Sequence, residues 1–176
     1  MYKRLFIFVE GADDELFFGK IAEILFKDIY DEIKIYQYAQ ESDTYIKGFL
    51  KSIRGMNADY ICISDLHSAP CVSKRKERVK DRFASFDENR ISVVKRAIEG
   101  WYLALLDDEA CREFKLKPSR IQNTEDIGES EFDDLIPKKF DSRVDFMFEI
   151  LDCASIETAR QRNTSFDYFI NKYCSG

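Results

Sequence analysis

Hydrophobic and polar positions along the first half of the chain predict short strands that alternate with helices. A continuous apolar run over residues 5–9 ends at Glu10 and Gly11, as in a short strand covered on both faces. From Asp13 onward the apolar residues recur at helical spacing, so a helix is expected to follow. The chain therefore begins as strand, loop and helix.

The alternation continues up to residue 106. The further expected elements are, in order, a strand at 33–39, a helix at 43–55, a strand at 60–63, a basic helix at about 73–86, a strand at 91–94 and a helix at 97–106. Units of this length, joined by right-handed crossovers, predict an α/β fold. Its sheet is expected to be Rossmann-like: mainly parallel, four-stranded and flanked by helices.

The second part of the chain has a different pattern. From residue 107 it is polar, with breaks at Pro118 and Pro137, and an irregular insert with short helices is expected there. Helical spacing then returns in two apolar stripes that we expect in the core: Val144, Met147, Phe148 and Leu151, and then Phe166, Phe169 and Ile170. We therefore expect an α/β core at 1–106, with the insert and a helical C-terminal extension at 107–176 packed on it in a single domain.

Composition narrows the class of protein. A chain of 176 residues with 45% hydrophobic content suits one domain, and its net charge of −6 argues against a surface that is positive throughout. The longest apolar runs are far short of the roughly 18 residues that cross a bilayer, so no membrane association is expected. The five cysteines form no CxxC pair and no leader precedes the first strand, which favours a cytoplasmic protein with reduced thiols.

Three acids follow predicted strands and are the candidates for chemistry. They are Glu10, Asp65 and Glu99, and in a parallel sheet ligands bind beyond the carboxyl ends of the strands. Carboxylates placed there can hold a hard cation such as Mg²⁺, which polarises a phosphoryl oxygen or helps to deprotonate a water molecule. We therefore expect these three side chains to meet in a site that acts on a phosphodiester.

Other residues near these acids have simpler expected roles. Asp13 and Asp14 are expected to cap and charge the first helix, while Gly11 is expected to allow a sharp turn of the backbone. Trp101, in the helix that carries Glu99, is expected in the core. The chain has no GxxxxGK[ST] loop, which argues against a self-contained NTPase.

Several stretches, taken in order, resemble one family. "FVEGADDE" looks like the first motif of the Toprim domain, the fold of topoisomerases, bacterial primases and overcoming-lysogenization-defect nucleases. "ICISDLHSAPC" resembles its second motif, an Asp-x-Asp at the end of the third strand, and "VVKRAIEGWYLALL" resembles the Glu-x-Trp helix of small stand-alone Toprim-like proteins of the nucleotidyl transferase/hydrolase group. "SRVDFMFEIL" and "NTSFDYFINKY" look like the C-terminal helices of that group, so the resemblance covers nearly the whole chain.

The resemblance implies roles for individual residues. Glu10 matches the glutamate of the family, a general base or metal contact, and Asp65 matches the first aspartate, which binds Mg²⁺. His67 stands where the second aspartate belongs, and it replaces an anionic oxygen ligand with a softer imidazole. Three interpretations stay open: His67 helps to bind Mn²⁺ or another transition metal, it contacts phosphate when protonated, or the site has lost activity.

A basic segment follows the Asp65 loop directly. "KRKERVKDR", residues 74–82, is either a solvated helix face with internal ion pairs or a phosphate-binding face. Its place in the chain favours nucleic acid, DNA or RNA, with Lys74, Arg75 and Arg78 on the phosphates.

The sequence therefore predicts a divalent-metal-dependent phosphodiester hydrolase, nuclease-like, that uses Mg²⁺ or Mn²⁺. Glu10, Asp65 and Glu99 are the expected catalytic residues, and His67 joins them as a metal ligand. The alternative is a noncatalytic nucleic-acid-binding or regulatory subunit with a degenerate metal site, and hydrolysis of a small phosphorylated molecule is a third possibility. A protein partner such as an ATPase and the number of subunits stay open.

Overall fold

The computed structural model describes residues 2–174, so residues 1, 175 and 176 of the predicted ranges lie outside the described residues. The chain divides into two compact units, of which the first runs to Val94 and the second begins at Lys95. The helix expected at 97–106 therefore belongs to the second unit. The packing of residues 107–176 on the α/β core stays a prediction.

The first unit is a sheet with flanking helices. Its elements are β1 (Arg4–Val9), α1 (Ala12–Phe26), β2 (Glu32–Gln37), α2 (Asp43–Gly55), β3 (Asp59–Asp65), α3 (Val72–Arg82), the 3-10 turn η1 (Glu88–Arg90) and β4 (Ile91–Val94). Within residues 2–174 the strands form one four-stranded sheet in the order β2-β1-β3-β4, and every neighbouring pair is parallel. This arrangement confirms the predicted α/β class and is consistent with a Toprim-like fold.

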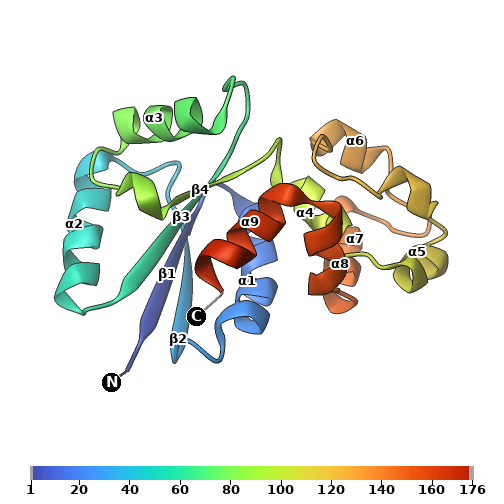
Figure 1. Ribbon diagram of the computed structural model, residues 1–176, viewed down its shortest axis with the longest axis horizontal. Coiled ribbons are helices and arrows are strands. Elements are labelled where there is room, and N and C mark those ends of the chain that lie inside the picture. Colours follow the sequence, from blue (N-terminus) through green and yellow to red (C-terminus); the bar gives the residue numbers. More distant parts are fainter. Residues whose placement is uncertain (1, 175–176) are drawn as a thin grey trace. The chain divides into compact units, whose positions relative to one another are not determined.

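The central strand explains why both faces of the sheet are covered. Successive side chains of a strand point to opposite faces, so Phe6 and Phe8 lie on one face of β1, and Leu5, Ile7 and Val9 lie on the other. Phe6 and Phe8 belong to a buried cluster with residues of α2 and α3. Figure 1 shows α2 and α3 together on one side of the sheet and α1 on the other side.

The strand register fixes the position of Glu10. Phe8 pairs with Cys62 in the parallel ladder between β1 and β3. Two residues further along each chain, Glu10 therefore lies beside Ser64 on the same face. Asp65 is the last residue of β3, so it stands at the same edge of the sheet as Glu10, but the alternation of side chains directs it to the opposite face.

The start of α1 confirms one expectation and corrects another. The Asp14 carboxylate accepts a hydrogen bond from the Gly11 backbone N–H at 3.1 Å, which is the predicted capping role. Gly11, however, has φ −143° and ψ −174°, an extended conformation that any residue adopts. The backbone does bend at Glu10 and Gly11, as predicted, but the conformation of Gly11 does not require a glycine.

The second unit is built from helices. Its elements are α4 (Ile98–Ala104), α5 (Asp108–Phe114), the 3-10 turn η2 (Pro118–Arg120), α6 (Glu129–Asp133), α7 (Arg143–Asp152), α8 (Ile156–Arg162) and α9 (Thr164–Tyr173). Trp101 is fully buried against Phe166 and Phe169, which confirms its predicted place in the core. The short helices α5 and α6 occupy the stretch in which an irregular insert was expected.

The buried face of α7 differs in part from the predicted stripe. Met147 and Leu151 are buried as expected, but Val144 and Phe148 are 46% and 52% exposed. Phe146 and Ile150 take their places in the core. A helix of ten residues makes fewer than three turns, and several apolar positions compete for its inner face, so periodicity alone left the phase ambiguous.

A buried polar network connects α9 to the loop that precedes α6. Asn163 Nδ2 donates to Thr124 Oγ1 at 3.0 Å, and Asn163 Oδ1 accepts from the backbone N–H of Phe166 and from the hydroxyl of Ser165. The indole N–H of Trp101 donates to the same Ser165 hydroxyl at 2.9 Å. Asn163 is 1% exposed, so this network ties separate segments of the second unit together from the inside.

A helix that spans a bilayer needs about 20 consecutive, mostly apolar residues. Among residues 2–174, none of the helices combines the length and apolar character that crossing a membrane requires.

Candidate functional site

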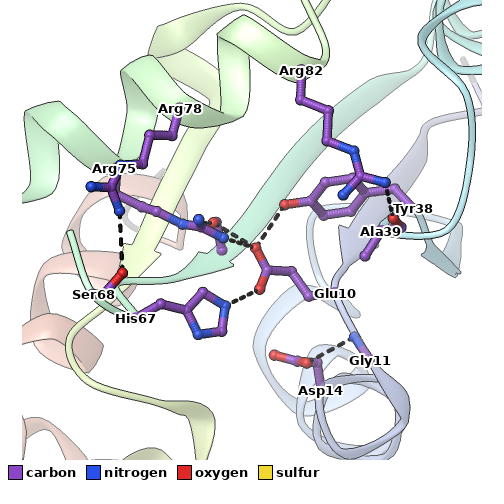
Figure 2. Close-up of polar contacts among 11 residues, drawn as sticks. Glu10, Gly11, Asp14, Tyr38, Ala39, His67, Ser68, Arg75, Arg78 and Arg82 are labelled. Carbon is purple, nitrogen blue, oxygen red and sulfur yellow. Dashed lines mark hydrogen bonds and ion pairs between the residues drawn. The ribbon is translucent and has the colours of Figure 1, made fainter.

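Glu10 is the centre of a polar cluster at the carboxyl edge of the sheet (Figure 2). Its Oε1 accepts hydrogen bonds from the Tyr38 hydroxyl at 3.1 Å and from the Ser64 hydroxyl at 2.7 Å. A third donor to the same oxygen is Nη2 of Arg75, which forms a close ion pair with the carboxylate. Oε2 faces Nε2 of His67 at 2.7 Å. Both oxygens of Glu10 are thus engaged by protein groups.

The Ser64 hydroxyl connects Glu10 to Arg75. Nε of Arg75 donates to Ser64 Oγ at 2.8 Å, and Ser64 Oγ in turn donates to Glu10 Oε1. Ser64 is fully buried, and the side chains of Arg75 and Glu10 are each only 16% exposed. Ion pairs shielded from water in this way are stronger than pairs at the surface, so α3 is held to the end of β1.

His67 reaches Glu10 because of its backbone conformation. It lies in the loop after β3 with φ 47°, in the left-handed region, which non-glycine residues rarely adopt. Its side chain is 53% exposed, so the ring covers the outer side of the Glu10 carboxylate. Because an ionised carboxylate only accepts hydrogen bonds, Nε2 of His67 carries the proton in this contact.

The surroundings keep Glu10 ionised. Burial by itself raises its pKa, but hydrogen bonds from Ser64 and His67 and the charge of Arg75 outweigh burial, and the pKa lies below the ordinary value of 4.5. Tyr38 is shifted the other way, because burial and nearby negative charge raise the pKa of its hydroxyl well above 10.0. At neutral pH Tyr38 is therefore a neutral donor beside an ionised carboxylate.

A pocket of about 290 Å³ opens beside this cluster. Glu10 and His67 contribute to its wall, and α3 contributes Arg75, Arg78 and Arg82. The three arginines are spaced three and four residues apart, so they share one face of the helix. Of the residues predicted to bind nucleic acid, Arg75 and Arg78 thus line the pocket, whereas Lys74 forms a 2.6 Å ion pair with Glu77 at the surface.

The other two predicted acids are also buried. Asp65, 9% exposed, ends β3 in the first unit, and the backbone N–H of Leu66 beyond it donates to the Val94 carbonyl at 2.9 Å. Glu99, 6% exposed, lies in the first turn of α4 in the second unit, where Arg143 forms a close ion pair with it. The meeting of Glu99 with Glu10 and Asp65 stays a prediction.

The donor atoms around Glu10 can be compared with what a divalent cation requires. Among residues 2–174, no group of three or more His, Cys, Asp and Glu side chains surrounds a common point. Oε2 of Glu10 and Nε2 of His67, 2.7 Å apart, nevertheless form a pair of donors. Divalent cations such as Mg²⁺ are often held by one or two protein ligands, with water and phosphate completing the shell. The pair fits one weakly held cation that replaces the hydrogen bond, and its nitrogen donor favours Mn²⁺ over Mg²⁺.

Sequence reasoning missed three residues of the site: Tyr38, Ser64 and Arg82. Tyr38 follows β2, which neighbours β1, so the strand order would have placed it at the same edge as Glu10. Ser64 precedes Asp65 directly and could have been found from the parallel register. Arg82 could have been found by projecting the basic segment on a helix, since it lies seven residues after Arg75.

Comparison with known proteins gives a match at the level of solved structures. No protein-family model matches the chain, and no curated protein sequence does. The C-terminal region of the Burkholderia pseudomallei OLD protein matches at 16% identity with a TM-score of 0.46, covering 99% of this chain and 100% of that one. The C-terminal region of the Xanthomonas campestris pv. campestris OLD protein matches at 16% identity with a TM-score of 0.45, covering 97% of each chain. The structural neighbours are C-terminal regions of OLD proteins.

Proposed function

We propose that this protein is a divalent-metal-dependent phosphodiester hydrolase, nuclease-like, that acts on DNA or RNA in the cytoplasm. The observation that carries the proposal is the Glu10 carboxylate, ionised at the carboxyl edge of a parallel sheet and adjoining a pocket lined by three arginines. Acids and arginines in one place suit a reaction in which a phosphate must approach carboxylates. The order of the Toprim-like motifs along the sequence supports the same class of reaction.

Different residues of the chain have different roles in this proposal. Arg75 and Arg78, with Lys74 from the exposed surface of the same helix, hold the phosphate backbone, and Arg75 offsets the repulsion between the phosphate and Glu10. Glu10 and His67 would hold the metal, and Asp65 and Glu99 complete the proposed catalytic set. A bound Mg²⁺ or Mn²⁺ would supply charge stabilisation at the phosphoryl oxygens. Glu10, kept ionised by its surroundings, would supply the negative charge that holds this ion next to the phosphate, and its lowered pKa makes it a weak general base.

The test is a cleavage assay on labelled single- and double-stranded DNA and RNA, with Mg²⁺ or Mn²⁺. Wild type is expected to cleave at least one substrate, and Glu10→Gln, of nearly the same shape, is expected to lose activity by about 100-fold, as for the loss of a group that holds the metal. Glu15→Gln is the matched control, because Glu15 is an exposed acid of α1 that bonds to Gln37. Equal cleavage by wild type and Glu10→Gln would refute the proposal.

One observation favours a second candidate, a noncatalytic nucleic-acid-binding or regulatory subunit. Oε1 of Glu10 already accepts from three donors, so Arg75 occupies the position of a positive counter-ion. In this candidate the ion pair is structural and the arginines only bind. It predicts oligonucleotide binding without cleavage by wild type in either metal, and binding that survives Glu10→Gln.

A further inference from the structure

The pocket beside Glu10 contains more positive charge than is needed to neutralise the Glu10 carboxylate. Of the three arginines in its wall, Arg75 is the one that pairs with Glu10. In the described part of the chain, Arg78 Nη1 contacts the Ser68 hydroxyl at 3.4 Å and Arg82 Nη2 donates to the Ala39 carbonyl at 2.5 Å, and neither pairs with a carboxylate. Three arginines against one glutamate leave two positive charges in excess. The ligand that matches this excess is a dianion.

The shape of the pocket limits the size of that ligand. Its inner wall includes Tyr38, Val79 and Phe83, which are all at most 5% exposed and belong to the buried cluster of the first unit. At about 290 Å³ the pocket is at the lower limit of sites that take drug-sized molecules. It has room for a phosphate and its attached sugar, but it is closed at the bottom by packed side chains.

A terminal phosphate fits the two excess positive charges and the limited size of the pocket better than an internal phosphate does. A phosphomonoester carries a charge of about −1.5 to −2 and three acceptor oxygens, whereas an internal phosphodiester carries one charge and continues as a chain on both sides. The planar guanidinium group of arginine can donate two parallel hydrogen bonds to two such oxygens. We propose that Arg75, Arg78 and Arg82 form a binding site for a phosphomonoester, the phosphorylated end of a nucleic acid or a nucleotide.

The arrangement of polar groups shows how the phosphate would be oriented. Figure 2 shows Arg75 and Tyr38 directed at Glu10, with Arg82 on the Tyr38 side of the cluster. The phosphate would lie against Arg78 and Arg82 and share Arg75 with Glu10, which limits the repulsion between the two anions. Arg82 would release the Ala39 carbonyl to do so. The proposal rests on the proposed function only in taking nucleic acid as the source of the phosphate.

Binding by the full chain in EDTA tests this site without any metal-dependent step. The probes are a short single-stranded oligonucleotide with a 5′-phosphate, its 5′-hydroxyl and 3′-phosphate counterparts, and a mononucleotide with its nucleoside. Fluorescence anisotropy of a probe labelled away from the tested end gives each Kd. Wild type is expected to bind at least one phosphorylated probe about tenfold more tightly than its unphosphorylated counterpart, as for one strong charge-assisted contact. Inorganic phosphate is expected to compete.

Four variants of α3 separate this site from general electrostatic attraction. Arg82→Gln and Arg78→Gln are expected to lose most of the preference for the phosphorylated end, and Arg82→Lys is expected to keep part of it, because it retains charge but not the fork. Lys76→Gln removes the same charge from the same helix outside the pocket, where Lys76 contacts the Glu88 carbonyl, and is expected to keep the preference.

The outcomes distinguish this inference from the proposed function. Equal affinity of wild type for phosphorylated and unphosphorylated probes overturns the phosphomonoester site, whether or not the protein cleaves nucleic acid with metal present. A preference that Lys76→Gln abolishes as strongly as Arg82→Gln overturns it as well, because general charge would then explain it. A preference without cleavage leaves the site standing and refutes the hydrolase. If an arginine variant does not fold, the affinities of wild type for the phosphorylated and unphosphorylated probes still test the site.

Discussion

Nε2 of His67 lies 2.7 Å from Oε2 of Glu10, although the two residues are 57 positions apart in the chain. The parallel pairing of β1 with β3 brings the ends of both strands to one edge, and the left-handed backbone of His67 turns its ring back toward the acid. The contact thus depends on the sheet and on one unusual backbone conformation together. It places an imidazole on the oxygen of Glu10 that the arginine leaves accessible.

The lowered pKa of Glu10 predicts how stability depends on pH. A carboxyl whose pKa is lower in the folded state stabilises the protein above its unfolded pKa, and this contribution is lost as the pH falls through the folded value. Denaturant unfolding in EDTA, from pH 7 down to below 4.5, is expected to show a smaller loss of unfolding free energy for Glu10→Gln than for wild type. Parallel pH profiles of the two proteins would contradict this expectation.

Two glycines should respond in opposite ways to the same substitution. A Cβ at Gly100 would lie 2.6 Å from the Thr124 carbonyl oxygen, so Gly100→Ala forces the backbone apart and is expected to cost about 1–3 kcal/mol. Gly19 lies on the exposed face of α1, where a methyl group would meet no other atom within 4 Å, so Gly19→Ala is expected to stabilise by about 0.5–1 kcal/mol. Thermal unfolding of both variants checks the opposite signs.

Asn163 should be the most sensitive polar residue of the second unit. Asn163→Ala removes the cap of α9 and leaves Thr124 and the Phe166 N–H without their buried partner, which is expected to cost about 1–3 kcal/mol. Asn171→Ala, an exposed change on α9 itself, is the control and is expected to stay within about 0.5 kcal/mol. Similar losses for the two variants in denaturant unfolding would show that the buried network contributes little.

The observed face of α7 can be tested by truncation. Met147 is fully buried and Phe148 is 52% exposed, so Met147→Ala is expected to cost about 2–5 kcal/mol and Phe148→Ala less than about 1 kcal/mol. The predicted stripe, in which both residues face the core, would give large losses for both. Urea unfolding midpoints of the two variants distinguish the two arrangements.

The fold was largely predictable from the sequence, and the site was predictable only in part. Runs such as residues 5–9 gave the strands, and their alternation with helices gave a parallel sheet, because these patterns follow from local geometry. The contacts of Glu10 with Tyr38 and Ser64 depend on strand order and register, which residue periodicity does not contain. The prediction of the buried face of α7 was partly wrong for a related reason, since tertiary packing decides which of several apolar faces is buried.

Metal binding should depend on the residue at position 67. Thermal shifts in Mn²⁺ and Mg²⁺ are expected to show that wild type is stabilised more by Mn²⁺, because a ligand that binds only the folded state raises its stability. His67→Asp supplies a second carboxylate next to Glu10 and is expected to increase the response to Mg²⁺. His67→Ala is the control and should weaken the response to both. A larger Mg²⁺ response for wild type than for His67→Asp would count against metal binding at this pair.

The left-handed backbone at position 67 has a consequence for how this edge of the sheet can change. Histidine, asparagine and aspartate are the non-glycine residues that adopt such a conformation most readily. A histidine codon becomes an aspartate codon by one base change, and the loop need not be rebuilt to receive the new side chain. A nitrogen donor and a carboxylate next to Glu10 are therefore separated by a single mutational step on an unchanged backbone.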